Sequence, residues 1–85
     1  MLKLIKKECI IYTFGIANDW TFEDMMAGLD CQIYSYDHTV DYPERRGDNI
    51  VFHKTGLGTG NNLKLLEEII AENGHQNTTI EYLKV

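Results

Sequence analysis

The sequence predicts an α/β fold with a mostly parallel sheet, and three features indicate it. Residues 9–16 are an aromatic and β-branched run with Gly15 near its end, which is typical of a strand buried on both faces. Residues 21–29 follow with helical spacing of apolar side chains, and residues 31–37 form a second strand-like run. A strand, a short helix and a strand in close succession predict a βαβ unit with a right-handed crossover.

Size and charge exclude several classes of protein. With 85 residues, 44% of them hydrophobic and 25% charged, the chain has room for one globular domain at most, and we do not expect a stand-alone enzyme. The net charge is −5 and the basic runs are no longer than pairs, so a nucleic-acid partner is not expected. The longest apolar stretch near the start, residues 9–12, is too short for a membrane segment or a secretory signal.

Thr21 is predicted to be the N-cap of the first helix, with Asp24 three residues later completing a near capping box. Its apolar residues recur at helical spacing and should form one stripe against the sheet, with the two methionines filling the core. These residues are Phe22, Met25, Met26 and Leu29.

Beyond residue 37 the pattern continues in the same alternating style. Residues 38–48 are polar and contain the only proline, so they predict a loop, and residues 49–54 predict a third strand. A glycine-rich turn at 56–60 should lead into a second helix capped by Asn61 or Asn62 and ended by Gly74. Its apolar residues are Leu63, Leu66 and Ile70 on one face, with Leu65 and Ile69 beside them.

Residues 79–85 predict a fourth strand, and the chain stops with that strand unfinished by any turn residue. We therefore expect residues 1–85 to be one unit, the first half of a domain that is truncated after its fourth parallel strand. The first and fourth predicted strands have the pattern of strands buried on both faces, and such strands need helices and further strands around them. The fragment alone should therefore be poorly stable and inactive.

Gly15 and Asp37 are the candidate ligand-binding residues. Ligands of open α/β sheets bind outside the carboxyl ends of the strands, where a glycine allows close approach and an acidic residue about 20 positions on binds ribose hydroxyls. Residues 11–14 and 33–36 should be adjacent parallel strands, so that Gly15 faces Asp37. Spacing alone leaves a simpler interpretation open, in which Gly15 is a turn residue and Asp37 a cap. A carboxylate near the adenosyl group also suits a sulfonium cofactor better than a second phosphate.

Other candidates carry weaker signals. The turn at 56–60 lies between a strand and a helix, but it lacks the third glycine of a dinucleotide loop and the lysine of a P-loop, so we interpret it as a flexible turn. The three histidines lack ligand spacing, and no metal site is expected. Trp20 with Phe22 fits either a pocket wall or an anchor under the loop. Cys9 and Cys31 are interpreted as buried thiols, with a disulfide in an oxidising compartment as the alternative.

Residues 11–23 and 31–37 carry a resemblance to a known family. The segment Ile-Tyr-Thr-Phe-Gly-Ile, followed by Trp-Thr-Phe-Glu and by Cys-Gln-Ile-Tyr-Ser-Tyr-Asp, is similar to the opening of the methyltransferase-like proteins of animals related to the FkbM-type methyltransferases. Those proteins open with YSFGI and W(S/T)FE, then a C-x-(V/I)-x-x-(F/Y)-D strand. Residues 50–58 and 65–85 also match, the latter resembling the segment just before the family's D-(I/V)-E-G motif.

The resemblance implies a Rossmann-like class I methyltransferase fold that binds S-adenosylmethionine. Phe14, Gly15 and Ile16 would form the cofactor loop, and Asp37 would bind the ribose. The general class I pattern is acidic-x-Gly-x-Gly-x-Gly, and this chain departs from it at three positions, which weakens the implied cofactor site. These departures are Thr13, Ala17 and Asp19.

The function predicted is methyl transfer from S-adenosylmethionine to an acceptor that the sequence does not identify. The family's acidic motif would follow Val85, so no catalytic residue is named, and neither compartment nor oligomeric state is predicted. One alternative is a non-catalytic Rossmann-like interaction module, which the weakened glycine motif favours. A second is a fragment of an NAD-type oxidoreductase, which would need more glycine at its pyrophosphate site.

Overall fold

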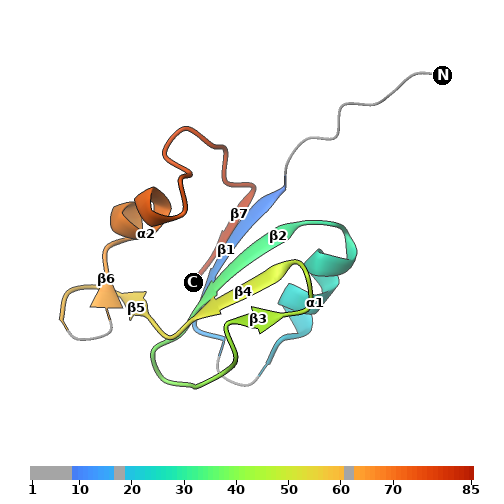
Figure 1. Ribbon diagram of the computed structural model, residues 1–85, viewed down its shortest axis with the longest axis horizontal. Helices are drawn as coiled ribbons and strands as arrows, with labels where there is room; N and C mark the ends of the chain where they lie inside the picture. The colour runs from blue at the N-terminus through green and yellow to red at the C-terminus, as the bar shows by residue number, and fades with distance from the viewer. Residues whose placement is uncertain (1–8, 17–18, 61–62) are drawn as a thin grey trace.

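The computed structural model describes residues 9–16, 19–60 and 63–85, and a single main sheet forms its centre (Figure 1). Four strands of this sheet are parallel, and a short fifth strand, β3, runs antiparallel at one edge. The strands are β1 (Ile10–Phe14), β2 (Gln32–Tyr36), β3 (Arg45–Arg46), β4 (Ile50–His53) and β7 (Tyr82–Lys84). Their order across the sheet is β3-β4-β2-β1-β7. The predicted α/β fold with a mostly parallel sheet is confirmed.

The strand β1 lies at the centre of the parallel set and is buried at all five positions. It pairs in parallel with β2 on one side, with Ile11 opposite Ile33 and Phe14 opposite Tyr36, as the sequence predicts. On its other side it pairs with β7. The four parallel strands therefore lie in the order third, second, first, fourth along the chain, with the change of direction at β1.

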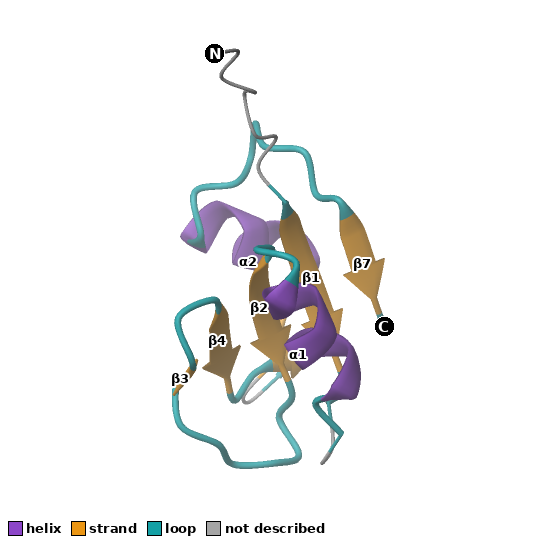
Figure 2. Cartoon of the chain, turned by 90° about the vertical axis from the view of Figure 1, so that its right-hand side faces the viewer, coloured by secondary structure: helices purple, strands orange, loops and turns teal. Residues whose placement is uncertain are grey.

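The helices α1 (Thr21–Gly28) and α2 (Leu66–Glu72) cover opposite faces of the sheet (Figures 1 and 2). The alternation of side chains along β1 supplies both faces. Ile11 joins the cluster under α1 with Ile33, Trp20 and Phe52. Tyr12 belongs to the cluster under α2, whose centre is the fully buried Ile69. Within the described part of the chain, a search for helices with the length and hydropathy of a membrane span finds none.

The helix α1 presents a different face to the sheet from the one predicted. Phe22 and Met26 pack against the core, but Met25 and Leu29 are 59% and 66% exposed, and Glu23 is fully buried. The predicted N-cap is also wrong, because Thr21 is the first helical residue. Its N–H donates a hydrogen bond to the Asp19 carboxylate. With the chain entering the helix through the buried Trp20, the helix is rotated away from the stripe that its hydrophobic spacing indicates.

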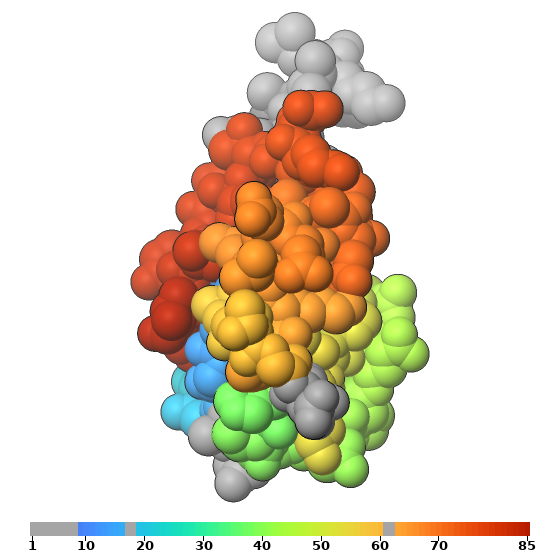
Figure 3. All heavy atoms as spheres, turned by 90° about the vertical axis from the view of Figure 1, so that its left-hand side faces the viewer, coloured from blue at the N-terminus to red at the C-terminus, as the bar shows by residue number. Residues whose placement is uncertain are grey.

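The second helix starts later than predicted. Leu63 and Lys64 form a short strand, β6 (Leu63–Lys64), that pairs in parallel with β5 (Gly56–Leu57). The predicted caps Asn61 and Asn62 lie outside the described residues, and α2 begins at Leu66. Figure 3 shows this part of the chain, in yellow and orange, covering one face of the molecule. The first two residues of the glycine-rich segment are thus part of a small second sheet, and residues 58–60 form a bend after it.

Three further differences concern edges of the fold. The polar loop at 38–48 contains β3, whose two residues pair with β4. The last strand, β7, has the predicted place in the chain, but Tyr82 and Leu83 are about half exposed, so it is not buried on both faces. Cys9 and Cys31 form a disulfide, so the interpretation as free thiols is wrong. The parallel pairing of β1 with β2 brings the two cysteines, which directly precede these strands, opposite each other.

Candidate functional site

The carboxyl ends of three parallel strands are joined by backbone hydrogen bonds at the predicted site. The N–H of Gly15, just after β1, donates to the carbonyl oxygen of Tyr36 at 2.9 Å. The N–H of Asp37, just after β2, donates to the carbonyl oxygen of His53 at 3.2 Å. Gly15 and Asp37 therefore lie side by side at the carboxyl ends of β1 and β2, which confirms the predicted arrangement of these two strands.

A cleft of about 440 Å³, here called the β1–β2 cleft, opens at this edge. Of the four predicted cofactor-binding residues, Phe14, Gly15 and Asp37 line it, whereas Ile16 does not. The side chain of Ile16 is 3% exposed and packs in the cluster under α1. The full lining is Phe14, Gly15, Tyr36, Asp37, His38, Thr39, Gly56, Leu57 and Val85.

Gly15 has the left-handed backbone conformation that favours glycine, with φ of +80°. A Cβ atom at this position would meet no atom of the described residues within 4 Å, so the space above the Gly15 backbone is open to that extent. A side chain there would project into free space beside the cleft. The glycine thus allows a ligand to approach the backbone at the end of β1 closely.

Asp37 is 5% exposed, and its carboxylate organises the turn that follows β2. Its Oδ1 accepts a hydrogen bond of 2.8 Å from the N–H of Thr39 and another from the Thr39 hydroxyl. These bonds fix the orientation of the carboxylate at the wall of the cleft. A carboxylate held in this way can accept hydrogen bonds from ligand hydroxyls without a large loss of side-chain entropy.

His38 and Gly56 also line this cleft, and neither was predicted from the sequence to be a site residue. A Cβ atom built on Gly56 would lie 2.4 Å from Nδ1 of His38 and 2.8 Å from a methyl group of Leu63. The His38 ring therefore packs directly against the Gly56 backbone, and any larger residue at position 56 would have to displace His38 or Leu63. The signal was present in the sequence as a glycine soon after the third strand, but we assigned that glycine to a turn.

The acidic position of the class I pattern is occupied by a neutral pair. Thr13 is 1% exposed, and its hydroxyl donates a hydrogen bond of 2.9 Å to the hydroxyl of Ser35, which lies opposite it on β2. This bond links the two strands one residue before the cleft. It satisfies the buried hydroxyl groups without placing a charge there. The second departure, Ala17, lies outside the described residues.

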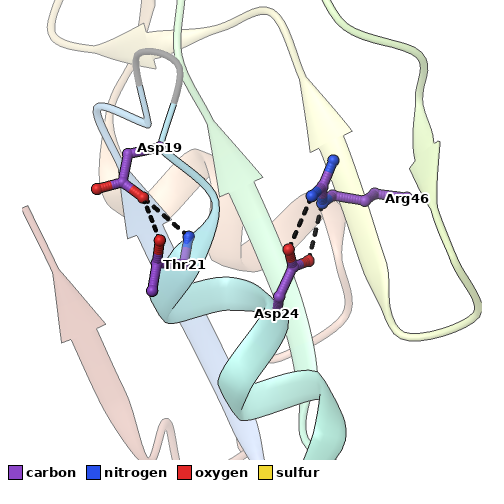
Figure 4. Close-up of polar contacts among 4 residues, drawn as sticks. All are labelled: Asp19, Thr21, Asp24 and Arg46. Atoms are coloured by element: carbon purple, nitrogen blue, oxygen red, sulfur yellow. Dashed lines mark hydrogen bonds and ion pairs between the residues drawn. The ribbon is translucent and has the colours of Figure 1, made fainter.

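The start of α1 is held by two polar contacts, drawn in Figure 4. The Asp19 carboxylate accepts hydrogen bonds from the N–H and hydroxyl of Thr21, which lower the pKa of Asp19. The Arg46 guanidinium on β3 donates two hydrogen bonds to the Asp24 carboxylate, of 2.8 and 2.7 Å. This bidentate ion pair lowers the pKa of Asp24. Since the Arg46 guanidinium also lies 4.8 Å from the centre of the Trp20 ring, it joins the edge strand to the segment that leads from β1 into α1.

Glu23 is a buried carboxylate in the first turn of α1, and its two oxygens have no hydrogen-bond partner among the described residues. The ammonium group of Lys84, near the end of β7, lies 3.7 Å from one of them. The same ammonium lies 5.1 Å from the centre of the Phe22 ring. Lys84 thus places a cation beside the buried Glu23 carboxylate and connects α1 to the outermost parallel strand.

A second cleft, of about 530 Å³, lies at the other end of the sheet and is called here the amino-edge cleft. It contains none of the predicted site residues. The described residues contain no group of three or more His, Cys, Asp or Glu side chains placed to hold a metal ion. The lining of this cleft is Asp24, Ala27, Gly28, Asp30, Arg46, Gly47, Asp48, Asn49 and Ile50.

Comparison with known proteins gives one match. The model of a protein family described as "Methyltransferase domain" matches residues 1–85, which is the whole chain. Neither the curated proteins nor the solved structures contain a match to this chain.

Proposed function

Because the chain belongs to the methyltransferase domain family, we propose that its β1–β2 cleft binds S-adenosylmethionine and that the complete protein transfers the cofactor's methyl group to an acceptor. The order of the parallel strands supports this proposal. Strand order third, second, first, fourth is that of the first four strands of a Rossmann-like sheet, in which ligands bind at the carboxyl ends near the change of direction.

One observation carries the proposal. The hydrogen bond from Gly15 to the Tyr36 carbonyl places a glycine with open space above it beside the buried carboxylate of Asp37. A ligand with a nucleoside group needs both features. Its ribose hydroxyls require a fixed hydrogen-bond acceptor, and the rest of the ligand must pass close to the protein backbone. Gly15 and Asp37, which are 22 positions apart in the sequence, thus line the same cleft.

The residues of the cleft fit the cofactor. Asp37 would accept hydrogen bonds from the ribose hydroxyls, and the backbone of Phe14 and Gly15 would lie against the rest of the ligand. His38, Gly56 and the apolar side chains of the cleft would enclose the adenine. When bound, S-adenosylmethionine supplies an electrophilic methyl group on a sulfonium centre. The contribution of this chain is to bind and orient the cofactor, since orientation supplies much of the rate of such a transfer.

We also propose that residues 1–85 are the cofactor-binding half of a domain of the FkbM-related type. The exposed side chains on β7 support this, because Tyr82 and Leu83 lie on an edge strand of a parallel sheet, and such strands are normally covered on both faces. The acceptor-binding and catalytic groups would then be supplied by other parts of the complete protein.

A non-catalytic interaction module of the same fold is the second candidate. The observation that favours it is the neutral Thr13–Ser35 pair at the position where the class I pattern has an acidic residue. This candidate predicts a folded complete protein without cofactor affinity.

Calorimetric titration of the complete protein with S-adenosylmethionine, and separately with NAD⁺, distinguishes the candidates. We expect saturable binding of S-adenosylmethionine with one site per chain and no heat of binding with NAD⁺. Binding of NAD⁺ alone would favour an oxidoreductase. The absence of binding of either ligand to a protein that melts cooperatively would favour the interaction module.

A further inference from the structure

The disulfide between Cys9 and Cys31 joins the amino ends of β1 and β2. Cys9 directly precedes β1 and Cys31 directly precedes β2, and their Cα atoms are 4.6 Å apart. Since the cleft lies at the carboxyl ends of the same two strands, the bond closes the opposite end of the central strand pair. It encloses α1 and the whole connection between these strands, with a sequence separation of 22.

Backbone contacts hold both cysteines in place independently of the covalent bond. The carbonyl oxygen of Cys9 accepts a hydrogen bond of 2.8 Å from the N–H of Gln32. The N–H of Cys31 donates to the carbonyl of Met26 at 3.2 Å, and its carbonyl accepts from the Asn49 side chain at 3.2 Å. The folded chain therefore brings the two thiols together at a position that the sheet and the end of α1 already fix.

The surroundings of the disulfide indicate a lasting structural bond. Cys31 is 3% exposed and Cys9 is half-buried, and both pack in the cluster under α1 beside Ile11 and Ile33. A reductant therefore has limited access to the sulfur atoms in the folded state. These are the only cysteines among the 85 residues, so no competing pairing exists within them.

We propose that oxidation of Cys9 and Cys31 stabilises the folded chain and that the protein matures in an oxidising compartment. In forming the bond, the two thiols lose two electrons and two protons to a protein or small-molecule disulfide, which is reduced to two thiols. Structural disulfides persist in such compartments and are rare where thiols are kept reduced. A small core gains much from this constraint on the unfolded chain. The inference does not depend on the proposed cofactor.

The first experiment asks whether the bond exists in the complete protein secreted from cells. After alkylation of free thiols under native conditions, non-reducing digestion and mass spectrometry should give one peptide in which Cys9 is linked to Cys31. Alkylated Cys9 and Cys31 in the folded protein would overturn the proposal.

The second experiment measures what the bond does. Wild type and a Cys9→Ala/Cys31→Ala variant are unfolded in denaturant with a dithiol, and each is refolded with and without the reductant. We expect the wild type refolded under reducing conditions to melt roughly 10–20 °C lower than the oxidised protein. The double variant should match the reduced wild type and should not respond to the reductant. Equal melting temperatures for oxidised and reduced wild type would overturn the proposal, even where the variant fails to fold.

Discussion

The N–H of Gly15 donates a 2.9 Å hydrogen bond to the carbonyl oxygen of Tyr36, and this contact carries the pairing of β1 and β2 one residue beyond the end of β1. Because Asp37 follows Tyr36 directly, the bond fixes the distance between the open glycine backbone and the carboxylate. The proposed cofactor site is therefore a consequence of strand register rather than of loop conformation. Four predictions test the roles of individual residues.

Asp37→Asn should weaken binding of S-adenosylmethionine to the complete protein by about 1.5–3 kcal/mol, the range for a hydrogen bond to a charged group. The asparagine oxygen can still accept the two hydrogen bonds from Thr39, so the turn after β2 should be kept. Calorimetry measures the affinity and a thermal melt measures the stability. Asp41→Asn, an exposed residue outside the cleft, is the control and should change neither value. Unchanged affinity for Asp37→Asn would exclude Asp37 from the site.

Gly56→Ala should displace the His38 ring and reduce cofactor affinity, because the added Cβ would lie 2.4 Å from Nδ1 of His38. Gly28→Ala is the matched control, since a Cβ there meets nothing within 4 Å and its backbone is helical. The control should raise stability by about 0.5–1 kcal/mol and leave affinity unchanged. If both variants bind the cofactor as the wild type does, the packing of His38 on Gly56 has no part in binding.

Tyr36→Phe should flatten the loss of stability at alkaline pH. Burial raises the pKa of Tyr36 from 10.0 to about 12, against the opposing effect of its hydrogen bond from Asn73. The phenol is neutral when protonated, so the folded state keeps its proton longer than the unfolded state does. Its contribution is complete below pH 10 and is lost as the pH rises through about 12. Burial also raises the pKa of Tyr12, so the Tyr12→Phe/Tyr36→Phe double variant should be flatter still.

Denaturant midpoints measured between about pH 9 and 12 test this prediction. This range covers the ordinary pKa of tyrosine, 10.0, and the raised pKa of Tyr36, about 12. Tyr82→Phe serves as the comparison, because the Tyr82 ring is 52% exposed, and it should follow the wild-type curve. A wild-type slope in the Tyr36→Phe variant would contradict the assignment.

Lys84→Met should destabilise the protein by about 1–3 kcal/mol, because it removes the ammonium group that lies 3.7 Å from the buried Glu23 carboxylate. Lys64→Met removes an ion pair with Glu72 in which both side chains are substantially exposed, and it should cost about 0–1 kcal/mol. Urea unfolding of both variants gives the comparison. Equal costs would mean that Glu23 does not depend on Lys84.

The central sheet and the pair at the site followed from local sequence. Each of β1 and β2 is a short apolar run, and Gly15 and Asp37 directly follow these runs, so the parallel register alone brings them together. The parallel direction of β1 and β2 could be inferred for the same reason. The place of β7 beside β1 and the antiparallel β3 depend on contacts between distant segments and were not predicted.

Other features depended on tertiary contacts that spacing does not encode. The face of α1 is set by Trp20, packed against Phe52 and Tyr42, so the exposed Met25 was placed in the core by periodicity alone. The role of Gly56 depends on a ring that lies 18 positions earlier in the chain, at His38. The proximity of Cys9 and Cys31 follows from strand register, but the spacing of the cysteines does not show whether they are oxidised to a disulfide.

The most direct test of the central claim is a titration of the isotope-labelled complete protein with S-adenosylmethionine, followed by two-dimensional NMR of the backbone amides. Our account predicts that the amides of Gly15, His38 and Gly56, which line the β1–β2 cleft, shift with one common dissociation constant. Gly28, Gly47 and Asn49, which line the amino-edge cleft, should keep their positions. Saturable shifts confined to the amino-edge cleft, or the absence of saturable shifts in a folded protein, would contradict it.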